Sequence, residues 1–286
     1  MSVHRGDEDR LDYEVVRAYW EDAAHEAESA SYMAHGQGLP RCCVEHRFAL
    51  ERAVVEGWFA GLGPTASVLD VGCGAGAWTE LFAQRYRRVV GIDASVGMLA
   101  VARRRLAGQG NVELVQGDAL TAALDGKFQG VLLGGLLMYL DRADAVALLV
   151  RLGQLAPRGR IILRESGVRS GVEVQTGTYQ VVYRSLQEYK GMAADAALRV
   201  IAIERNRGYA HMEIAIALAN MARRLPPLAR RDAAAVGGPL WHFLRATAPV
   251  TLELVPRAIE AVGLDWPHLT NHFLLLEPGP KPALLR

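Results

Sequence analysis

The stretch Val68-Leu-Asp-Val-Gly-Cys-Gly-Ala-Gly-Ala77 decides the fold, because an apolar strand runs directly into glycines at alternate positions. These glycines are Gly72, Gly74 and Gly76, and a helix is predicted to follow them. Glycine permits a sharp backbone turn and lets a ligand approach the main chain closely. A helix that begins there presents unpaired N–H groups and a positive partial charge. The stretch therefore predicts a strand–loop–helix unit that cradles a ligand.

Short apolar strands alternate with helices on the C-terminal side of this stretch. The strands read as continuous apolar runs, which is typical of strands covered on both faces. Alternation of this kind predicts βαβ units, and so an α/β fold with a doubly wound, mostly parallel sheet. The predicted strands are Ser67–Val71, Arg88–Ile92, Val112–Val115, Gly130–Gly134 and Arg160–Glu165, and the predicted helices are Trp78–Tyr86, Met98–Leu106 and Ala143–Leu155.

The two flanks of this pattern are predicted to be more helical. Residues 1–62 form a helical N-terminal cap in this interpretation, and residues 63–286 form the main domain with a helical insertion at about 205–269. A further helix is expected at Leu186–Asp195. Strands at Leu198–Glu204 and His272–Leu276 are expected to pair antiparallel and to close the sheet.

Composition narrows the class of partner. The chain has 286 residues, 51% of them hydrophobic, and a net charge of +1, which disfavours disorder and counterion-driven binding to nucleic acid. Three cysteines make no disulfide framework and no zinc-type spacing, so no metal is expected and a reducing cytoplasm is favoured. The charged segment Met1–Arg10 is unlike a secretory signal, and no apolar run reaches the length of a membrane span. We therefore expect a cytoplasmic protein with a small-molecule partner, no nucleic acid and no membrane.

Carboxylates stand at the ends of two predicted strands. Asp93 ends the second strand, where an acidic residue can accept both hydrogen bonds of a ribose diol. Asp118 follows the third strand in Gly117-Asp-Ala119, where a carboxylate can meet an exocyclic adenine amine. Together with the glycine loop, these positions indicate an adenosine-containing ligand.

These residues resemble the class I S-adenosylmethionine-dependent methyltransferases. The stretches that carry the resemblance are Leu69–Gly76, Gly91–Ser95 and Gln116–Ala119, whereas a dinucleotide-binding domain more often spaces its glycines as G-x-G-x-x-G. The resemblance implies a seven-stranded Rossmann-like sheet, with S-adenosyl-L-methionine as methyl donor and S-adenosyl-L-homocysteine as product. The cofactor-binding residues that it implies are Tyr19, Trp20, Asp70, Gly72, Gly74, Asp93, Ala94, Met98, Asp118, Ala119 and Gly134.

A second set of stretches is similar to the protein N-terminal amine methyltransferases. It consists of Ala18-Tyr-Trp-Glu21, whose Tyr-Trp pair lies over the cofactor in that family, Leu163-Arg-Glu-Ser166 at the end of the fifth strand, and Tyr183-Arg-Ser185, which is expected to open the next helix. The chain departs from the family at Ser166, where Asn is expected, at Tyr139, where His is expected, and near Tyr179, where an acid is expected. These departures favour a different acceptor.

We therefore predict methyl transfer to an N or O atom of a small organic molecule, in specialised biosynthesis. Methylation of a peptide N-terminus, or cofactor binding without methyl transfer, are the alternatives. Helix Tyr209–Arg224 is interpreted as a lid or as the interface of a homodimer, with a membrane-surface helix as the alternative.

Four residues are candidates for the acceptor site. Tyr139 follows the fourth strand directly and Glu165 ends the fifth, as an acceptor contact or a base. The alternatives are a packing role for Tyr139, and for Glu165 an ion pair with Arg164 or Arg184. His35, in a glycine-containing loop, carries an imidazole suited to proton transfer near pH 7, and Tyr179 occupies the acidic station. His46 and His211 are weaker candidates of the same kind.

Overall fold

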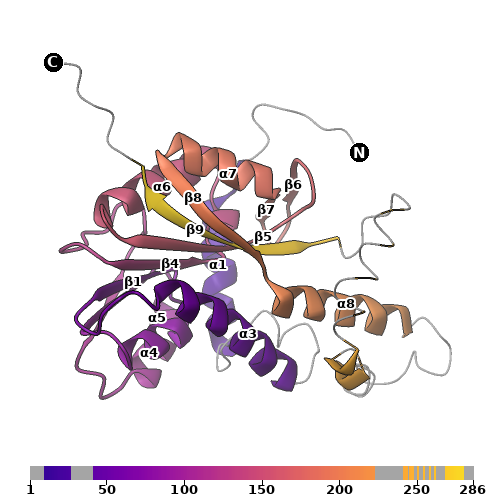
Figure 1. The fold of residues 1–286 in the computed structure, drawn as a ribbon, viewed down its shortest axis with the longest axis horizontal. Helices are drawn as coiled ribbons and strands as arrows, with labels where there is room; N and C mark the ends of the chain where they lie inside the picture. Colours follow the sequence, from indigo (N-terminus) through magenta and orange to yellow (C-terminus); the bar gives the residue numbers. More distant parts are fainter. Residues whose placement is uncertain are drawn as a thin grey trace.

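The computed structural model describes residues 10–26, 41–222 and 268–279, with short pieces and single residues between 241 and 261. A seven-stranded sheet forms its centre (Figure 1), in the order β3-β2-β1-β4-β5-β9-β8. Strands β1 to β5 all run parallel, whereas β9 lies antiparallel between β5 and β8. The predicted fold class is confirmed. The strands are β1 Ser67–Val71, β2 Arg88–Asp93, β3 Val112–Gln116, β4 Gly130–Gly134, β5 Arg160–Gly167, β8 Leu198–Arg205 and β9 Thr270–Pro278.

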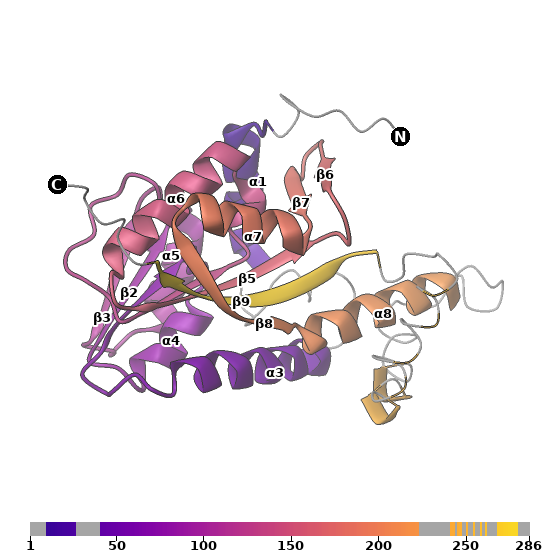
Figure 2. The ribbon, with the colours of Figure 1, turned by 45° about the horizontal axis from the view of Figure 1, so that its top comes forward.

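Helices cover both faces of the sheet (Figure 2). Side chains of a strand alternate between the faces, so Leu69 and Val71 of β1 enter one core while Val68 enters the other. The first core packs against α6 (Arg142–Leu155) and α7 (Leu186–Asp195). The second packs against α3 (Arg41–Phe59) and α4 (Ala77–Ala83).

Helix α3 is part of these layers. Its Val55 and Phe59 are buried in the second core, so this part of the predicted N-terminal cap, residues 1–62, packs against the sheet. The segment α8 (Arg207–Ala222) lies beside α3 (Figure 2), and a Cβ at Gly208 would stand only 2.9 Å from the Cα of Arg47. Within the described residues, no helix is long and apolar enough to cross a membrane.

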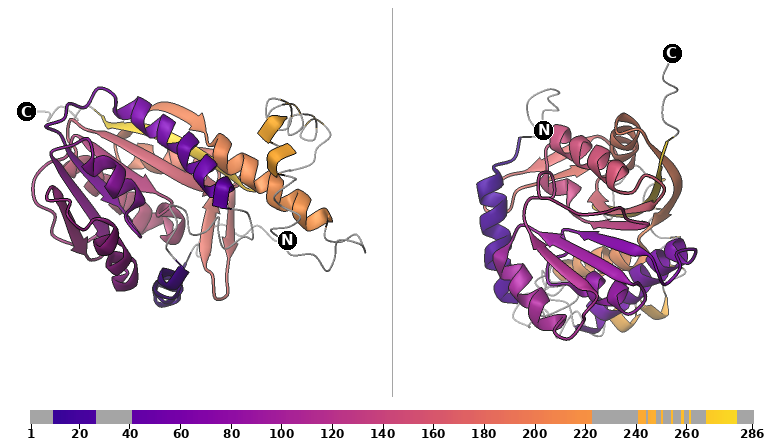
Figure 3. Two further views of the ribbon diagram at one scale, coloured as in Figure 1. Left: turned by 90° about the horizontal axis from the view of Figure 1, so that it is seen from below. Right: turned by 90° about the vertical axis from the view of Figure 1, so that its left-hand side faces the viewer.

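Strands β6 (Val172–Gln175) and β7 (Val181–Arg184) form a two-stranded arm outside the main sheet, visible as a projecting hairpin in the left view of Figure 3. The sequence pattern does not indicate this arm, and it predicts that Tyr183 and Arg184 open a helix. These residues end β7 instead, and Ser185 caps α7 by accepting a hydrogen bond from Glu188 N–H. A four-residue strand is too short for periodicity to reveal it.

Candidate functional site

The glycine loop after β1 has the backbone that its sequence predicts. Gly72, Gly74 and Gly76 have φ values of +69°, +52° and +80°, which favour glycine. The N–H of Gly72 donates to the Ile92 carbonyl at 2.8 Å, so the loop is joined to the end of β2. A Cβ at Gly74 would meet no heavy atom within 4 Å, and Gly74 lines a cavity. The loop therefore leaves open space for a ligand at its main chain.

Asp93 connects this loop to the next one. Its carboxylate accepts hydrogen bonds from the N–H of Gly74 at 2.8 Å and of Ser95 at 2.9 Å. Burial raises the pKa of Asp93, and these backbone donors oppose the increase. At the end of the next strand, the Asp118 carboxylate accepts a hydrogen bond from the N–H of Leu120 at 2.8 Å.

A cavity of about 520 Å³ lies between these loops and α1 (Tyr13–Ala23). Its volume falls in the range of small-molecule and cofactor pockets. The sequence-predicted residues that line it are Trp20, Gly72, Gly74, Asp93, Ala94, Met98, Asp118, Ala119, Gly134 and Tyr139. Of the other predicted residues, Tyr19, Asp70, Glu165 and Tyr179 do not line it, and His35 lies outside the described residues.

Carboxylates predominate among the charged residues around the cavity. Glu14, Glu21, Asp93 and Asp118 line it, and Arg17 is the cationic lining residue. Arg17 is paired with Glu14 at 3.0 Å, which leaves the other carboxylates to set the local potential. An acidic lining favours a ligand with positive charge, and a sulfonium cofactor with an ammonium group has that charge.

Helix α1 is attached to the fold at both ends, across the mouth of the cavity. The Glu21 carboxylate accepts hydrogen bonds from the Ser95 hydroxyl at 2.7 Å and the Gly97 N–H at 2.8 Å. At the other end, the Tyr13 hydroxyl donates to Asp144 at 2.7 Å and accepts from the Asp141 N–H at 3.1 Å. Sequence reasoning missed these contacts, because nothing local to α1 indicates its distant partners.

Asp70 and Tyr19 lie outside the cavity lining. Asp70 is buried under the glycine loop and accepts a hydrogen bond from the Thr79 hydroxyl at 2.6 Å. Burial raises the pKa of Asp70 to about 7. The Tyr19 ring packs against Trp20 and Tyr179, with centroids 5.4 and 4.8 Å away.

Tyr139 brings the aromatic residues together at one end of the cavity. Trp20 meets its ring edge-on, with centroids 5.3 Å apart, and its hydroxyl shares a 2.9 Å hydrogen bond with the Tyr179 hydroxyl. Burial raises the pKa of Tyr139 well above its ordinary value, so its phenol stays protonated near neutral pH. The group is therefore suited to hydrogen bonding rather than to proton abstraction.

Glu165 is buried away from the cavity lining. Its Oε1 accepts hydrogen bonds from the backbone N–H groups of Leu136 and Leu137, each at 3.2 Å. Burial raises the pKa of Glu165 to about 7. The neighbouring Arg164 pairs with Glu51 at 3.1 Å. Neither reading from sequence, as an acceptor contact or as half of an ion pair, describes these hydrogen bonds.

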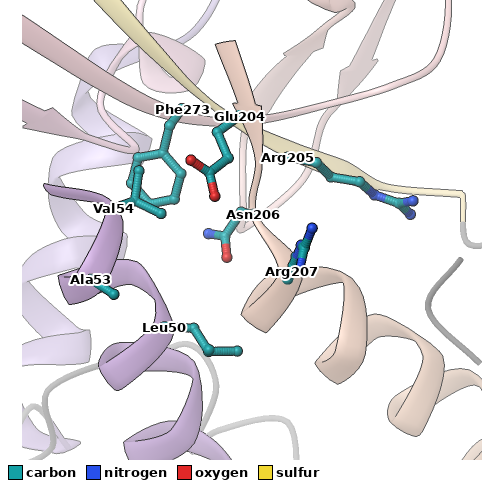
Figure 4. A pocket seen from close by; sticks show the side chains of 8 residues that line it. All are labelled: Leu50, Ala53, Val54, Glu204, Arg205, Asn206, Arg207 and Phe273. Carbon is teal, nitrogen blue, oxygen red and sulfur yellow. The ribbon is translucent and has the colours of Figure 1, made fainter. Parts of the chain in front are cut away.

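A second cavity of about 250 Å³ lies between α3 and the junction of β8 with α8 (Figure 4). It contains none of the motif residues, and its lining includes Asn206, whose amide already donates to Glu51 at 2.7 Å and Asn271 at 2.9 Å. His211 is buried near this region, stacked on Trp241 with centroids 4.4 Å apart, and His46 meets the same ring edge-on. These histidines belong to aromatic packing between α3 and the insertion.

The comparisons with known proteins agree with this geometry. Residues 68–159, from the first strand of the sheet to just before the fifth, match a family model described as a methyltransferase domain. The match covers 92 of the 286 residues and includes all three motif stretches, so this part of the chain is similar to a methyltransferase domain. The cradle of glycines next to a buried strand-end carboxylate fits S-adenosylmethionine, the cofactor that the sequence resemblance implies.

Individual relatives cover only part of the molecule. The 2-phytyl-1,4-naphtoquinone methyltransferase of Thermosynechococcus vestitus is 40% identical over 100 residues, 33% of this chain and 44% of that enzyme. The chain spans less than half the length of the curated relatives it matches. Two solved structures share the fold. A Leishmania major S-adenosylmethionine-dependent methyltransferase has a TM-score of 0.56 at 22% identity, over 70% of this chain and 80% of its own. The magnesium protoporphyrin IX methyltransferase of Synechocystis, with bound cofactor, has a TM-score of 0.51 at 21% identity, over 71% and 93%.

Proposed function

We propose that the protein transfers the methyl group of S-adenosylmethionine to an N or O atom of a small organic molecule. The observation that carries this proposal is the cavity itself, which is acidic beside the motif loops and aromatic and aliphatic at the end near Tyr139. When bound, S-adenosylmethionine would supply a methyl group on a positively charged sulfur, with S-adenosylhomocysteine as the leaving group. Everything else in the reaction is binding, alignment and exclusion of water.

The residues of the motif loops would hold the donor. Gly72 and Gly74 let the methionine part approach the main chain, Asp93 holds the ribose hydroxyls, and Asp118 and Ala119 flank the adenine. These roles come from the family resemblance, and they are supported by the positions of all five residues on the cavity wall. Glu21 extends the acidic lining from α1, at the point where its carboxylate meets the loop after Asp93.

The acceptor would approach at the end formed by the segment after β4. Gly135, Leu136, Tyr139 and Leu140 line the cavity there, and Trp20 faces Tyr139 from α1. A mostly apolar wall excludes water and suits an uncharged organic acceptor, while the Tyr139 hydroxyl supplies a hydrogen-bonding group to orient it. Because Tyr139 stays protonated near neutral pH, it is not the base, and an acceptor that has to lose a proton must pass it to another group.

Labelled cofactor provides the test. The protein is incubated with methyl-labelled S-adenosylmethionine and panels of small amines and phenols, with peptides carrying free N-termini as a separate panel. Transfer to small molecules only supports the proposal, and transfer to peptides alone would replace it by the peptide alternative. Calorimetry with S-adenosylhomocysteine runs in parallel, so that binding without transfer to either panel would favour a non-methylating protein.

A further inference from the structure

The segment after β4 forms one wall of the cavity but has little secondary structure of its own. It consists of Gly135–Leu140 and contains a single 3₁₀ turn, Leu137–Tyr139. Its internal hydrogen bonds run from Tyr139 N–H to the Leu136 carbonyl at 2.9 Å and from Leu140 N–H to the Leu137 carbonyl at 3.3 Å. A turn with two such bonds does not fix its own position, since 3₁₀ geometry is weak in short pieces.

Glu165 holds the beginning of this turn. Its Oε1 accepts from two consecutive N–H groups, those of Leu136 and Leu137, and the side chain is only 1% exposed. These N–H groups lie at the N-terminal side of the turn, where intrahelical partners are absent. A carboxyl oxygen is placed here as a backbone acceptor, with its other oxygen, Oε2, buried and without a hydrogen-bond partner in the described part of the chain.

Arg184 holds the other end of the turn. Its guanidinium donates from Nη1 to the Leu137 carbonyl at 2.9 Å and from Nη2 to the Leu140 carbonyl at 2.8 Å. The residue is 1% exposed, and these two carbonyl partners account for its burial, because arginine is almost never so deeply buried without partners. A planar guanidinium can hold two carbonyl groups at once, which the point charge of a lysine cannot do in the same geometry.

The β6–β7 arm brings this arginine to the turn. Arg184 ends β7, and its carbonyl oxygen comes so close to β5 that a Cβ at Gly167 would stand 1.9 Å from it. The loop of the same arm carries Tyr179, which shares its hydroxyl hydrogen bond with Tyr139. One hairpin therefore contacts two parts of the turn: Arg184 binds main-chain carbonyls of the turn, and Tyr179 binds the Tyr139 side chain.

We propose that Glu165, Arg184 and Tyr179 are positioning residues that together place Tyr139 and the wall around it for the acceptor. Glu165 thus acts through the turn and is not the base. The inference rests on the proposed function in one respect, namely that the acceptor approaches at Tyr139. It predicts that loosening this three-residue clamp impairs alignment for transfer and leaves binding of the cofactor nearly intact, because the Asp93 carboxylate is held by the N–H groups of Gly74 and Ser95 and not by the turn.

The test compares two arginines that each donate to main-chain carbonyls. Arg184→Lys is the test variant, and Arg160→Lys is its control. Arg160 is the first residue of β5, at the end away from Glu165 and Gly167, and it donates to the Trp58 carbonyl at 2.6 Å. Turnover by Arg184→Lys should fall by about 10- to 100-fold, the order expected for a misplaced reacting group. Its affinity for S-adenosylhomocysteine should stay within about threefold of the wild type, a small change on the scale of 1.4 kcal/mol per tenfold. The control should retain both.

A second measurement does not depend on turnover. 3-Fluorotyrosine incorporated at position 139 reports the environment of that ring by ¹⁹F NMR, in the wild type, Arg184→Lys, Tyr179→Phe and Arg160→Lys. Compared with the wild type, the signal should broaden or shift in Arg184→Lys and Tyr179→Phe and stay unchanged in the control, Arg160→Lys. Glu165→Gln, whose amide oxygen still accepts, should restore the wild-type signal that Glu165→Ala loses.

The outcomes separate the two proposals. If no acceptor is ever methylated but the ¹⁹F signal responds as expected, the positioning role stands and the proposed function fails. An unchanged ¹⁹F signal in Arg184→Lys, or equal effects of Arg184→Lys and Arg160→Lys on turnover and affinity, would overturn the positioning role.

Discussion

The two sides of the cavity are built in different ways. On the cofactor side, the contacts are made by main chain and by near neighbours, such as Asp93 with Ser95, two residues apart, and with Gly74, 19 residues apart. On the acceptor side, the contacts join side chains and main chain from distant elements, such as Tyr139 with Tyr179, 40 residues apart, and Arg184 with Leu137, 47 apart. The Asp93 contacts arise within one βαβ unit, to which Glu21 of α1 adds a distant contact at Ser95, whereas the acceptor side depends throughout on the assembled fold.

The two sides should differ in how many substitutions they tolerate. A glycine loop with φ values of +52° to +80° constrains the backbone itself, so it tolerates few substitutions and suits a constant ligand. A wall held by Glu165, Arg184 and Tyr179 is positioned by side chains, which can be replaced one at a time. The acceptor side is therefore where a different substrate can be accommodated without disturbing the donor.

The largest expected effect tests the cofactor side. Asp93→Ala should weaken binding of S-adenosylhomocysteine at least about 100-fold, because hydrogen bonds to a charged group contribute about 1.5–3 kcal/mol each and 1.4 kcal/mol is tenfold. The loss should be larger than any on the acceptor side, since the same carboxylate also holds Gly74 and Ser95. Titration calorimetry measures it.

Its matched control is Asp195→Ala. Asp195 is half exposed and pairs with Arg142 on the surface at 2.8 Å, so its removal should leave the affinity unchanged. Equal affinities of Asp93→Ala and the wild type would remove the ribose assignment and, with it, the contrast between the two sides.

The second prediction concerns buried carboxyl groups, one on each side. Unfolded Glu165 loses its proton near its ordinary pKa of 4.5, whereas folded Glu165 keeps it to about pH 7. Between these values the folded state binds the extra proton, so the free energy of unfolding falls as pH rises. The loss is about 3 kcal/mol for Glu165, and Asp70 adds a loss of the same sign between its ordinary pKa of 3.8 and about 7.

Urea unfolding from pH 4 to 8 separates the two groups. In Glu165→Gln, the free energy of unfolding should fall less steeply with pH, because only the contribution of Asp70 remains. The exposed Glu113→Gln, whose side chain is 53% exposed, should keep the wild-type slope. A Glu165→Gln curve parallel to the wild type would show that this carboxyl is ionised in the folded state.

How much the sequence could predict follows the same division. The five parallel strands were predicted to within two residues, because continuous apolar runs and the glycine loop are local signals. The arm β6–β7 was missed, and with it the reason for Arg184, since four-residue strands leave no periodic trace. Glu165 is predicted from its place at the end of a strand to contact the acceptor or to act as a base, whereas its observed partners are backbone N–H groups, which no residue type indicates.

Gly167, at the end of β5, is the residue that lets the arm approach the sheet closely. Gly167→Ala would place a Cβ 1.9 Å from the Arg184 carbonyl oxygen, so β5 and β7 must separate. We expect a loss of about 1–3 kcal/mol of stability, as for other overpacked sites, together with lower turnover. The midpoint of chemical unfolding at an unchanged m-value measures the first effect.

Gly191→Ala is the counterpart with the opposite sign. Gly191 lies in α7, and a Cβ there would meet nothing within 4 Å, so alanine should stabilise the helix by about 0.5–1 kcal/mol. If both variants were stabilised, the close approach of β5 and β7 would not exist in solution, and the clamp would lose its support.

The smallest expected effect concerns α1, which contacts both sides through Glu21 and Trp20. Tyr13→Phe removes the hydroxyl that joins α1 to Asp141 and Asp144, a loss of about 1 kcal/mol. Amide hydrogens of α1 should then exchange about fivefold faster, the factor that corresponds to that free energy. Arg17→Ala, on the same helix, removes only a surface pair with Glu14, whose side chains are 58% and 85% exposed, and should leave exchange unchanged. Faster exchange confined to Tyr13→Phe shows that α1 opens from its Tyr13 end, whereas equal exchange in both variants would show that Glu21 alone holds the helix over the donor.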